Sequence, residues 1–208
     1  MSSSVLMNCN HAMLTVQPLA GEAITPYIDA LARLRIEVFR EFPYLYDGDM
    51  DYERRYLNTF RQAPDSLLVL VLDEDEVVGA STALPLEHET ANIRQPLEDA
   101  GYDVRKVFYF GESVLRKGYR GRGLGVRFFE ERERRARLLE RFDTLAFCAV
   151  VRPAGHPLRP EGYLPLDGFW RKRGFAPTDR HCHISWQDLD EDEETPKPLR
   201  FWIKSLVP

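Results

Sequence analysis

Hydrophobic residues follow a helical period in some segments and a strand period in others, and the two periods divide the chain into predicted elements. A first strand is predicted at 13–16. The helix after it is predicted to begin at Thr25 and Pro26, which supply a cap and a first-turn proline. The apolar side of this helix consists of residues three or four positions apart, namely Ile28, Leu31, Leu34 and Val38. A second helix is predicted at about 50–62.

Two apolar runs within residues 66–86, separated by acidic turn residues, predict a β-hairpin. Residues 87–102 have the pattern of an insertion that carries a short helix. The remaining elements are predicted in the order strand, helix, strand, short helix, strand, strand, at 104–115, 123–142, 143–151, 166–174, near 181–186 and near 199–206.

This order predicts an α/β (α+β) fold with one central mixed, twisted sheet of about six to seven strands and helices on both faces. With 208 residues, 44% of them hydrophobic and 29% charged, the chain is expected to form a single domain over 1–208. The acidic stretch 188–198 is too short to divide domains, so it indicates a hairpin loop or a short linker.

The composition favours a cytoplasmic protein. No apolar run approaches the roughly 20 residues of a membrane span, and the first residues lack the pattern of a signal peptide, so no membrane partner is expected. Three scattered cysteines do not suggest a disulfide framework. The formal charge of −5 argues against nucleic acid as a general partner.

The sequence GYRGRGLGVRFFEERERRA at 118–136 places glycines and arginines before a long charged helix. A helix N-terminus has unpaired N–H groups and a partial positive charge, and glycine lets a ligand approach the backbone, so the segment suits a phosphate or pyrophosphate. It matches neither the dinucleotide motif nor a P-loop. A plain glycine-rich turn with solvated arginines, or an RNA contact through the RGRG sequence, are the alternatives.

The segment 112–129 resembles the acetyl-CoA-binding segment of the GNAT N-acetyltransferase superfamily. Arg120, Gly123 and Gly125 match its signature of Arg or Gln, then x-x-Gly-x-Gly or Ala, between a strand and a helix. The sequence FWRKRGF at 169–175 lies where that family has an aromatic residue and a Gly-Phe pair. The resemblance implies a GNAT-like fold whose two central strands splay apart to admit pantetheine, with acetyl-CoA as acyl donor.

The resemblance also implies which residues bind the donor. The amides from 122 to 126 would hold the pyrophosphate, and main-chain groups of Val114 and Leu115 would contact pantetheine and the thioester carbonyl. The complete implied set is Val114, Leu115, Arg120, Gly121, Arg122, Gly123, Leu124, Gly125 and Val126.

Chemistry on the thioester requires a base, because a lysine-type amine with a pKa of about 10.4 is almost fully protonated at neutral pH. Glu112 is the candidate, and its alternative role is an ion pair with an arginine. Many GNAT enzymes have a tyrosine that can protonate the leaving thiolate at the position where this chain has Trp170. Tyr163 is therefore the candidate general acid, and the alternatives are Tyr119 or departure of the thiolate without an acid. Cys148 is expected in the core.

The connection between the first two helices is the expected acceptor site, in which Tyr44, Tyr46 and Asp47 would present rings and a carboxylate to an ammonium group. Tyrosines packed beside a tight turn are the alternative. His156 is a possible second base in the loop 152–165. His181 and His183 flank Cys182, but no further metal ligands cluster with them in the sequence, so no metal is expected.

The sequence therefore predicts an acetyl-CoA-dependent N-acetyltransferase that transfers the acetyl group directly to a primary amine of a small molecule or peptide. The alternative is a non-catalytic acyl-CoA-binding regulatory protein with the same fold. The sequence leaves the acceptor and the choice between monomer and homodimer open.

Overall fold

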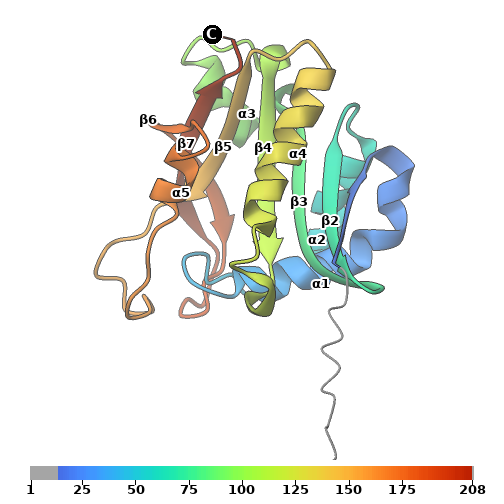
Figure 1. Cartoon of the computed structure of the whole chain (residues 1–208). Helices are drawn as coiled ribbons and strands as arrows, with labels where there is room; N and C mark the ends of the chain where they lie inside the picture. Colours follow the sequence, from blue (N-terminus) through green and yellow to red (C-terminus); the bar gives the residue numbers. More distant parts are fainter. Residues whose placement is uncertain (1–13, 208) are drawn as a thin grey trace, which may run out of the picture.

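A computed structural model describes residues 14–207 and contains one seven-stranded sheet in the order β1-β2-β3-β4-β5-β7-β6 (Figure 1). All neighbouring strands are antiparallel except β4 and β5. The strands are β1 Thr15–Leu19, β2 Leu67–Asp73, β3 Glu76–Pro85, β4 Val107–Leu115, β5 Thr144–Val150, β6 Ala176–Trp186 and β7 Thr195–Ser205. The α-helices are α1 Ile28–Phe39, α2 Met50–Gln62, α3 Ala91–Glu98, α4 Leu124–Leu138 and α5 Asp167–Arg171.

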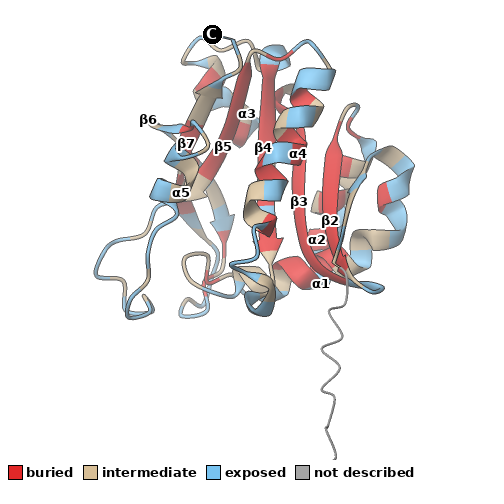
Figure 2. Cartoon of the chain, in the orientation of Figure 1, coloured by how far each residue is buried: buried red, intermediate tan, exposed pale blue. Residues whose placement is uncertain are grey.

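Helices cover both faces of the sheet, which confirms the predicted fold class. Side chains of α1, α2 and α3 pack on one face, and side chains of α4 and α5 pack on the other. The central strands are therefore buried on both sides, as Figure 2 shows, and this explains the near-continuous apolar sequence of β2 and β3.

The sheet opens between its two parallel strands. Backbone pairing of β4 with β5 is confined to 107–109 on β4 and 144–146 on β5. Both strands continue beyond these residues, β4 to Leu115 and β5 to Val150, without pairing to each other. The edge of β4 that faces β5 is therefore free of its neighbour over the second half of the strand.

A β-bulge in β4 decides which face its side chains reach. Ser81 pairs with Ser113, but Ala83, two residues further on, pairs with Phe110, so β4 holds one extra residue here. Tyr109 and Glu112 consequently lie on the same face although they are three positions apart. Without the bulge, alternation would direct Glu112 to the α4 face.

Arg132 of α4 fixes this bulge from the opposite face. Its guanidinium donates to the Ser113 hydroxyl (2.9 Å) and, more weakly, to the carbonyl oxygen of Glu112 (3.4 Å). It also lies over the ring of Phe110, 4.3 Å from the centroid. Burial lowers the pKa of Arg132 to about 9, yet these contacts keep a large cation inside the core.

Several predicted boundaries differ from the observed ones. The first helix was predicted to begin at Thr25, but 21–27 form a 3-10 helix, in which Thr25 donates to Glu22 and does not cap α1. The residue that begins the predicted strand, Met13, lies outside the described residues, and β1 runs from Thr15 to Leu19. The predicted helix at 123–142 ends earlier, at Leu138.

The last two strands are longer than predicted and form a hairpin. The acidic stretch 188–198 is thus the turn of this hairpin and the start of β7, not a linker. Within the described residues, none of the helices has the length and apolar character needed to cross a bilayer.

Candidate functional site

The turn before α4 presents a row of unused backbone donors. Gly121 and Gly123 have φ of +77° and +81°, in the left-handed region that favours glycine. Gly123 caps the helix, and the first amide to bond back to it is that of Arg127 (3.1 Å). The amides from 121 to 126 therefore have no acceptor among the described residues, an arrangement suited to an anion.

The two arginines within this turn, Arg120 and Arg122, have different partners. Arg120 donates to Glu41, just after α1 (2.8 Å), and to the carbonyl oxygen of Leu115 (3.0 Å). Arg122 lies over the ring of Tyr119, 5.2 Å from its centroid, in an exposed position. Since the pair between Arg120 and Glu41 is largely solvated, it is weak enough for another anion to compete.

The free edge of β4 provides a main-chain donor next to the turn. The amide of Arg116 bonds to the carbonyl oxygen of Val78 on β3 (3.0 Å). Because backbone groups alternate in direction along an antiparallel strand, Val114 also bonds toward β3, and the amide of Leu115 points toward the opening. Val114 and Leu115 were both predicted to contact pantetheine and the thioester carbonyl through their main chain. Only the amide of Leu115 points toward the opening, so the geometry favours Leu115.

Glu112 lies on the α1–α2 face of β4 and is almost fully buried. Its Oε2 is 2.7 Å from Nη1 of Arg35 and accepts a hydrogen bond from the Tyr56 hydroxyl (3.2 Å). Its Oε1 has no partner among the described residues. The alternative interpretation of Glu112, an ion pair with an arginine, is therefore observed, but it uses only one of the two carboxylate oxygens.

Arg35 joins Glu112 to a second buried carboxylate, that of Glu53 on α2. Burial acts to lower the pKa of Arg35, but the two neighbouring carboxylates hold it above its ordinary value. Burial, and next the charge of Glu112, raise the pKa of Tyr56. Sequence reasoning missed Arg35, since its helical position among apolar residues resembles any arginine at the edge of a core.

The tyrosines predicted to bind the acceptor lie close to this network. Tyr44 packs on Phe39, with 4.5 Å between ring centroids, and its pKa is raised by burial and then by Cys148. Burial and the charge of Glu53 raise the pKa of Tyr46. Asp47, in contrast, is exposed and pairs with Arg40 at 2.7 Å, so the structure does not bring it to the same cluster.

Tyr163 lies in the loop between β5 and α5, against the connection between α1 and α2. Its ring packs edge-on against Phe42, with 4.7 Å between centroids, and burial raises its pKa. The His156 ring also packs against Phe42, with 5.8 Å between the ring centroids. The loop 152–165 is therefore in contact with the connection that was predicted to form the acceptor site.

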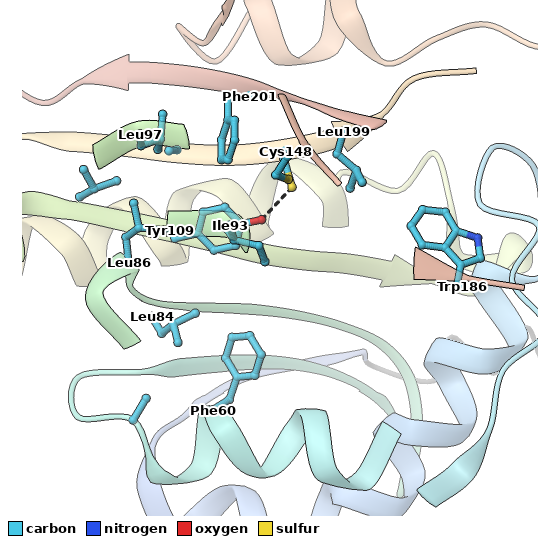
Figure 3. Close-up of a cluster of buried hydrophobic side chains, with 14 residues drawn as sticks. Phe60, Leu84, Leu86, Ile93, Leu97, Tyr109, Cys148, Trp186, Leu199 and Phe201 are labelled. Atoms are coloured by element: carbon cyan, nitrogen blue, oxygen red, sulfur yellow. Dashed lines mark hydrogen bonds between the residues drawn. The ribbon is translucent and has the colours of Figure 1, made fainter. Parts of the chain in front are cut away.

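The remaining candidates lie in packing positions. The Trp170 indole packs against Phe147 and Trp202, with centroids 5.2 and 5.0 Å away. Cys148 is buried and shares a 2.9 Å hydrogen bond with the Tyr109 hydroxyl (Figure 3). The neighbouring Cys182 is buried in the same core cluster.

A buried ionic clamp holds the acceptor-side connection in place. Arg152, just after β5, donates to the carbonyl oxygens of Pro43 (2.7 Å) and Tyr44 (2.6 Å) and to Asp188 (2.8 Å). The Trp186 indole donates to the same aspartate at 2.8 Å. The clamp therefore ties the connection between α1 and α2 to β5 and to the β6–β7 hairpin.

We expect Arg152→Met to raise the KM for the acceptor about tenfold or more and to lower the melting temperature, because it removes the main ion-pair partner of a buried carboxylate. Among the described residues, Asp188 would keep only Lys197 at 3.5 Å and the Trp186 indole, so the cost should not exceed about 3–5 kcal/mol. Coenzyme affinity should remain unchanged, since the clamp does not contact the turn before α4. Steady-state kinetics and thermal unfolding would measure both effects. Arg105→Met, which removes an exposed arginine paired locally with Asp103, is the control.

A model of a known protein family matches a large part of the chain. The sequence model of the Acetyltransferase (GNAT) family matches residues 31–159. No curated protein matches the sequence.

Solved structures share the fold at low identity. Ribosomal-protein-alanine N-acetyltransferase from Brucella melitensis is 14% identical, with a TM-score of 0.59 over 92% of this chain and 99% of that one. The protein yncA from Salmonella typhimurium, solved with its cofactor acetyl-CoA, is 12% identical, with a TM-score of 0.59 over 93% and 94%. An aminoglycoside 6'-N-acetyltransferase complexed with coenzyme A is 15% identical, with a TM-score of 0.58 over 93% and 98%.

Proposed function

Because the chain belongs to the GNAT acetyltransferase family, we propose that it transfers an acetyl group from acetyl-CoA directly to a primary amine of a small molecule or peptide. The observation that carries this proposal is the row of unpaired amides from 121 to 126 beside the opening between β4 and β5. Relatives of the same fold were solved with acetyl-CoA and with coenzyme A, which supports the choice of donor.

The main chain would position the donor. Amides at the start of α4 would bind the pyrophosphate, with Arg120 released from Glu41 to add charge. The pantetheine arm would lie along the free edge of β4, and the amide of Leu115 would donate to the thioester carbonyl oxygen. A hydrogen-bond donor whose position is fixed before the reaction stabilises the oxyanion without reorganisation.

Glu112 would act on the acceptor as its base. Its Oε1 is buried and has no hydrogen-bond partner among the described residues, while Arg35 and Tyr56 hold Oε2 in place. Tyr44 and Tyr46 would line the approach, where aromatic faces attract a cation. Tyr163 would protonate the leaving thiolate, and its contact with Phe42 ties it to the acceptor side.

The acceptor class is open to a direct test. We expect acetyl-CoA at about one hundred times its Kd to raise the melting temperature by about 5–10 °C, because such saturation adds about 2.7 kcal/mol. A panel of polyamines, amino acids, aminoglycosides and peptides would then be screened with acetyl-CoA present, by release of free thiol. Transfer to none of the amines, despite coenzyme binding, would contradict the proposed reaction.

A further inference from the structure

Two arginines between β4 and α4 are joined to the end of α1 by ion pairs. Arg116 pairs with Glu37 on α1 at 3.0 Å, and Arg120 pairs with Glu41 just after it. The two glutamates are four positions apart, which places them on one side of the helix end. The start of α4 and α1 lie at the same end of the sheet in Figure 1. The turn before α4 is therefore tied to α1 at two places.

The pair between Arg120 and Glu41 is bidentate. Nη1 of Arg120 is 2.8 Å from Oε2 of Glu41, and Nη2 is 3.0 Å from Oε1. The Nε of the same arginine donates to the carbonyl oxygen of Leu115 at the end of β4 (3.0 Å). Parallel hydrogen bonds of this kind are directional, so they fix the guanidinium between β4 and Glu41 although both charged side chains are nearly half exposed.

Arg120 thereby touches three parts of the proposed site. It belongs to the turn whose unpaired amides would bind the diphosphate, and it bonds to Leu115, whose amide would meet the thioester. Its carboxylate partner, Glu41, lies near the start of the connection between α1 and α2, which is the expected acceptor site. The amides of Tyr44 and Leu45 both bond to the carbonyl oxygen of Glu41 (3.1 Å each). A change in the position of Glu41 is therefore transmitted to the backbone of Tyr44.

Arg116 and Arg120 differ in how fully their charges are neutralised. Arg116 pairs with two carboxylates, those of Glu37 and Glu76. Among the described residues, Glu41 is the one carboxylate paired with Arg120. Exposed ion pairs are weak, so a diphosphate bound to the amides of the turn would compete with Glu41 alone for the guanidinium. Arg120 is thus the arginine that can be transferred from a carboxylate of the protein to a ligand.

We infer that Glu41 is a positioning residue that acts through Arg120, because it holds the guanidinium in the unliganded protein and yields it to the diphosphate of the coenzyme. The inference rests on the proposed function. When Arg120 turns to the diphosphate, Glu41 loses its partner, and the connection between α1 and α2 loses one attachment to the turn before α4. Coenzyme binding is thereby linked to loosening of the acceptor side. Such a linkage is reciprocal, so loosening the connection must favour coenzyme binding.

The first test is the affinity for coenzyme A, measured by calorimetric titration of the full chain. Glu41→Gln removes the competing charge and nearly keeps the shape of the side chain, so it should bind coenzyme A about two- to fivefold more tightly than the wild type. A residue that only supported the fold of the turn would weaken binding when it is substituted.

Glu37→Gln is the matched control. It makes the same change of charge one helical turn earlier, at a side chain of similar exposure, 52% against 46% for Glu41. Its arginine, Arg116, keeps Glu76 as a partner. Because the effect of one distant surface charge is screened by salt, the affinity of Glu37→Gln should stay within about 1.5-fold of the wild type.

A double-mutant cycle isolates the contribution of the pair. Arg120→Gln retains a residue type that the family signature allows at this position, but glutamine cannot form an ion pair with Glu41. In the Arg120→Gln background, Glu41→Gln should therefore change the affinity for coenzyme A by less than about 1.5-fold. The gain in affinity that Glu41→Gln produces should appear only when Arg120 is present.

Hydrogen exchange tests the link to the acceptor side. The amides of Tyr44 and Leu45 bond to Glu41, and that of Tyr46 bonds to the carbonyl oxygen of Phe39 (2.9 Å). Saturating coenzyme A should speed exchange of these three amides about two- to fivefold in the wild type, because release of Glu41 makes local opening easier. In Glu41→Gln their exchange should already be faster without ligand, and coenzyme A should change it little.

Tighter binding by Glu41→Gln that depends on Arg120, together with faster exchange on coenzyme binding, would support the inference. If Glu41→Gln binds coenzyme A as the wild type does or more weakly, the inference is wrong and the proposed function stands. The same conclusion follows if bound coenzyme A leaves exchange of the three amides unchanged or slows it. If the wild type binds no coenzyme A, both the inference and the proposed function are wrong.

Discussion

Glu112→Gln should lower kcat by about 10²–10⁴-fold and leave coenzyme binding intact, because the substitution removes the carboxylate that we propose as the base but changes nothing at the turn before α4. The shape of the side chain is kept, and the amide oxygen can still accept from Tyr56. Steady-state assays of thiol release would measure kcat, and calorimetric titration of the variant with coenzyme A would measure the affinity for the coenzyme.

The matched control is Glu53→Gln. Glu53 shares Arg35 with Glu112, but it is fully buried on α2 and its substitution tests what loss of an ion pair alone does. We expect this variant to lose stability while its kcat changes less than about tenfold. Equal losses of kcat in both variants would assign Glu112 a structural role only. Full activity of Glu112→Gln would remove it from the mechanism.

Gly123→Val should weaken coenzyme binding by at least about 100-fold, which corresponds to about 2.8 kcal/mol. The φ of +81° at this position is unfavourable for any residue with a Cβ and most unfavourable for a β-branched one. To relieve the strain the turn must change its path, and the amides from 121 to 126 would no longer converge. Calorimetric titration with acetyl-CoA would measure the loss.

Gly118→Val controls for added bulk on the same turn. Gly118 is exposed, has no left-handed φ, and a Cβ built on it meets no atom within 4 Å. Its substitution should therefore change coenzyme affinity by less than about threefold. If both glycine variants bind coenzyme as the wild type does, the turn is not the diphosphate site.

Much of the fold could be predicted because local signals and tertiary structure agree. Asp49 accepts from the amide of Tyr52 and caps α2, so the helix observed at Met50–Gln62 coincides with the predicted one. The glycine turn and α4 were also predictable, since left-handed glycines and a charged amphipathic helix leave a strong pattern.

The surroundings of the proposed base were not predictable to the same degree. The sequence gives no sign of the bulge in β4, which depends on pairing with β3 and turns Glu112 toward α1. Nor does it bring together Arg35, Glu53 and Glu112, which lie on three elements far apart in the chain.

Calorimetric titration of the purified protein with coenzyme A and acetyl-CoA tests the central claim most directly. If the amides that open α4 bind the diphosphate, each ligand should give a saturable one-to-one isotherm, and acetyl-CoA should displace coenzyme A from the same site. Absence of any measurable heat or saturation at millimolar concentrations of both ligands would contradict the account, because the protein would then have no acyl group to transfer.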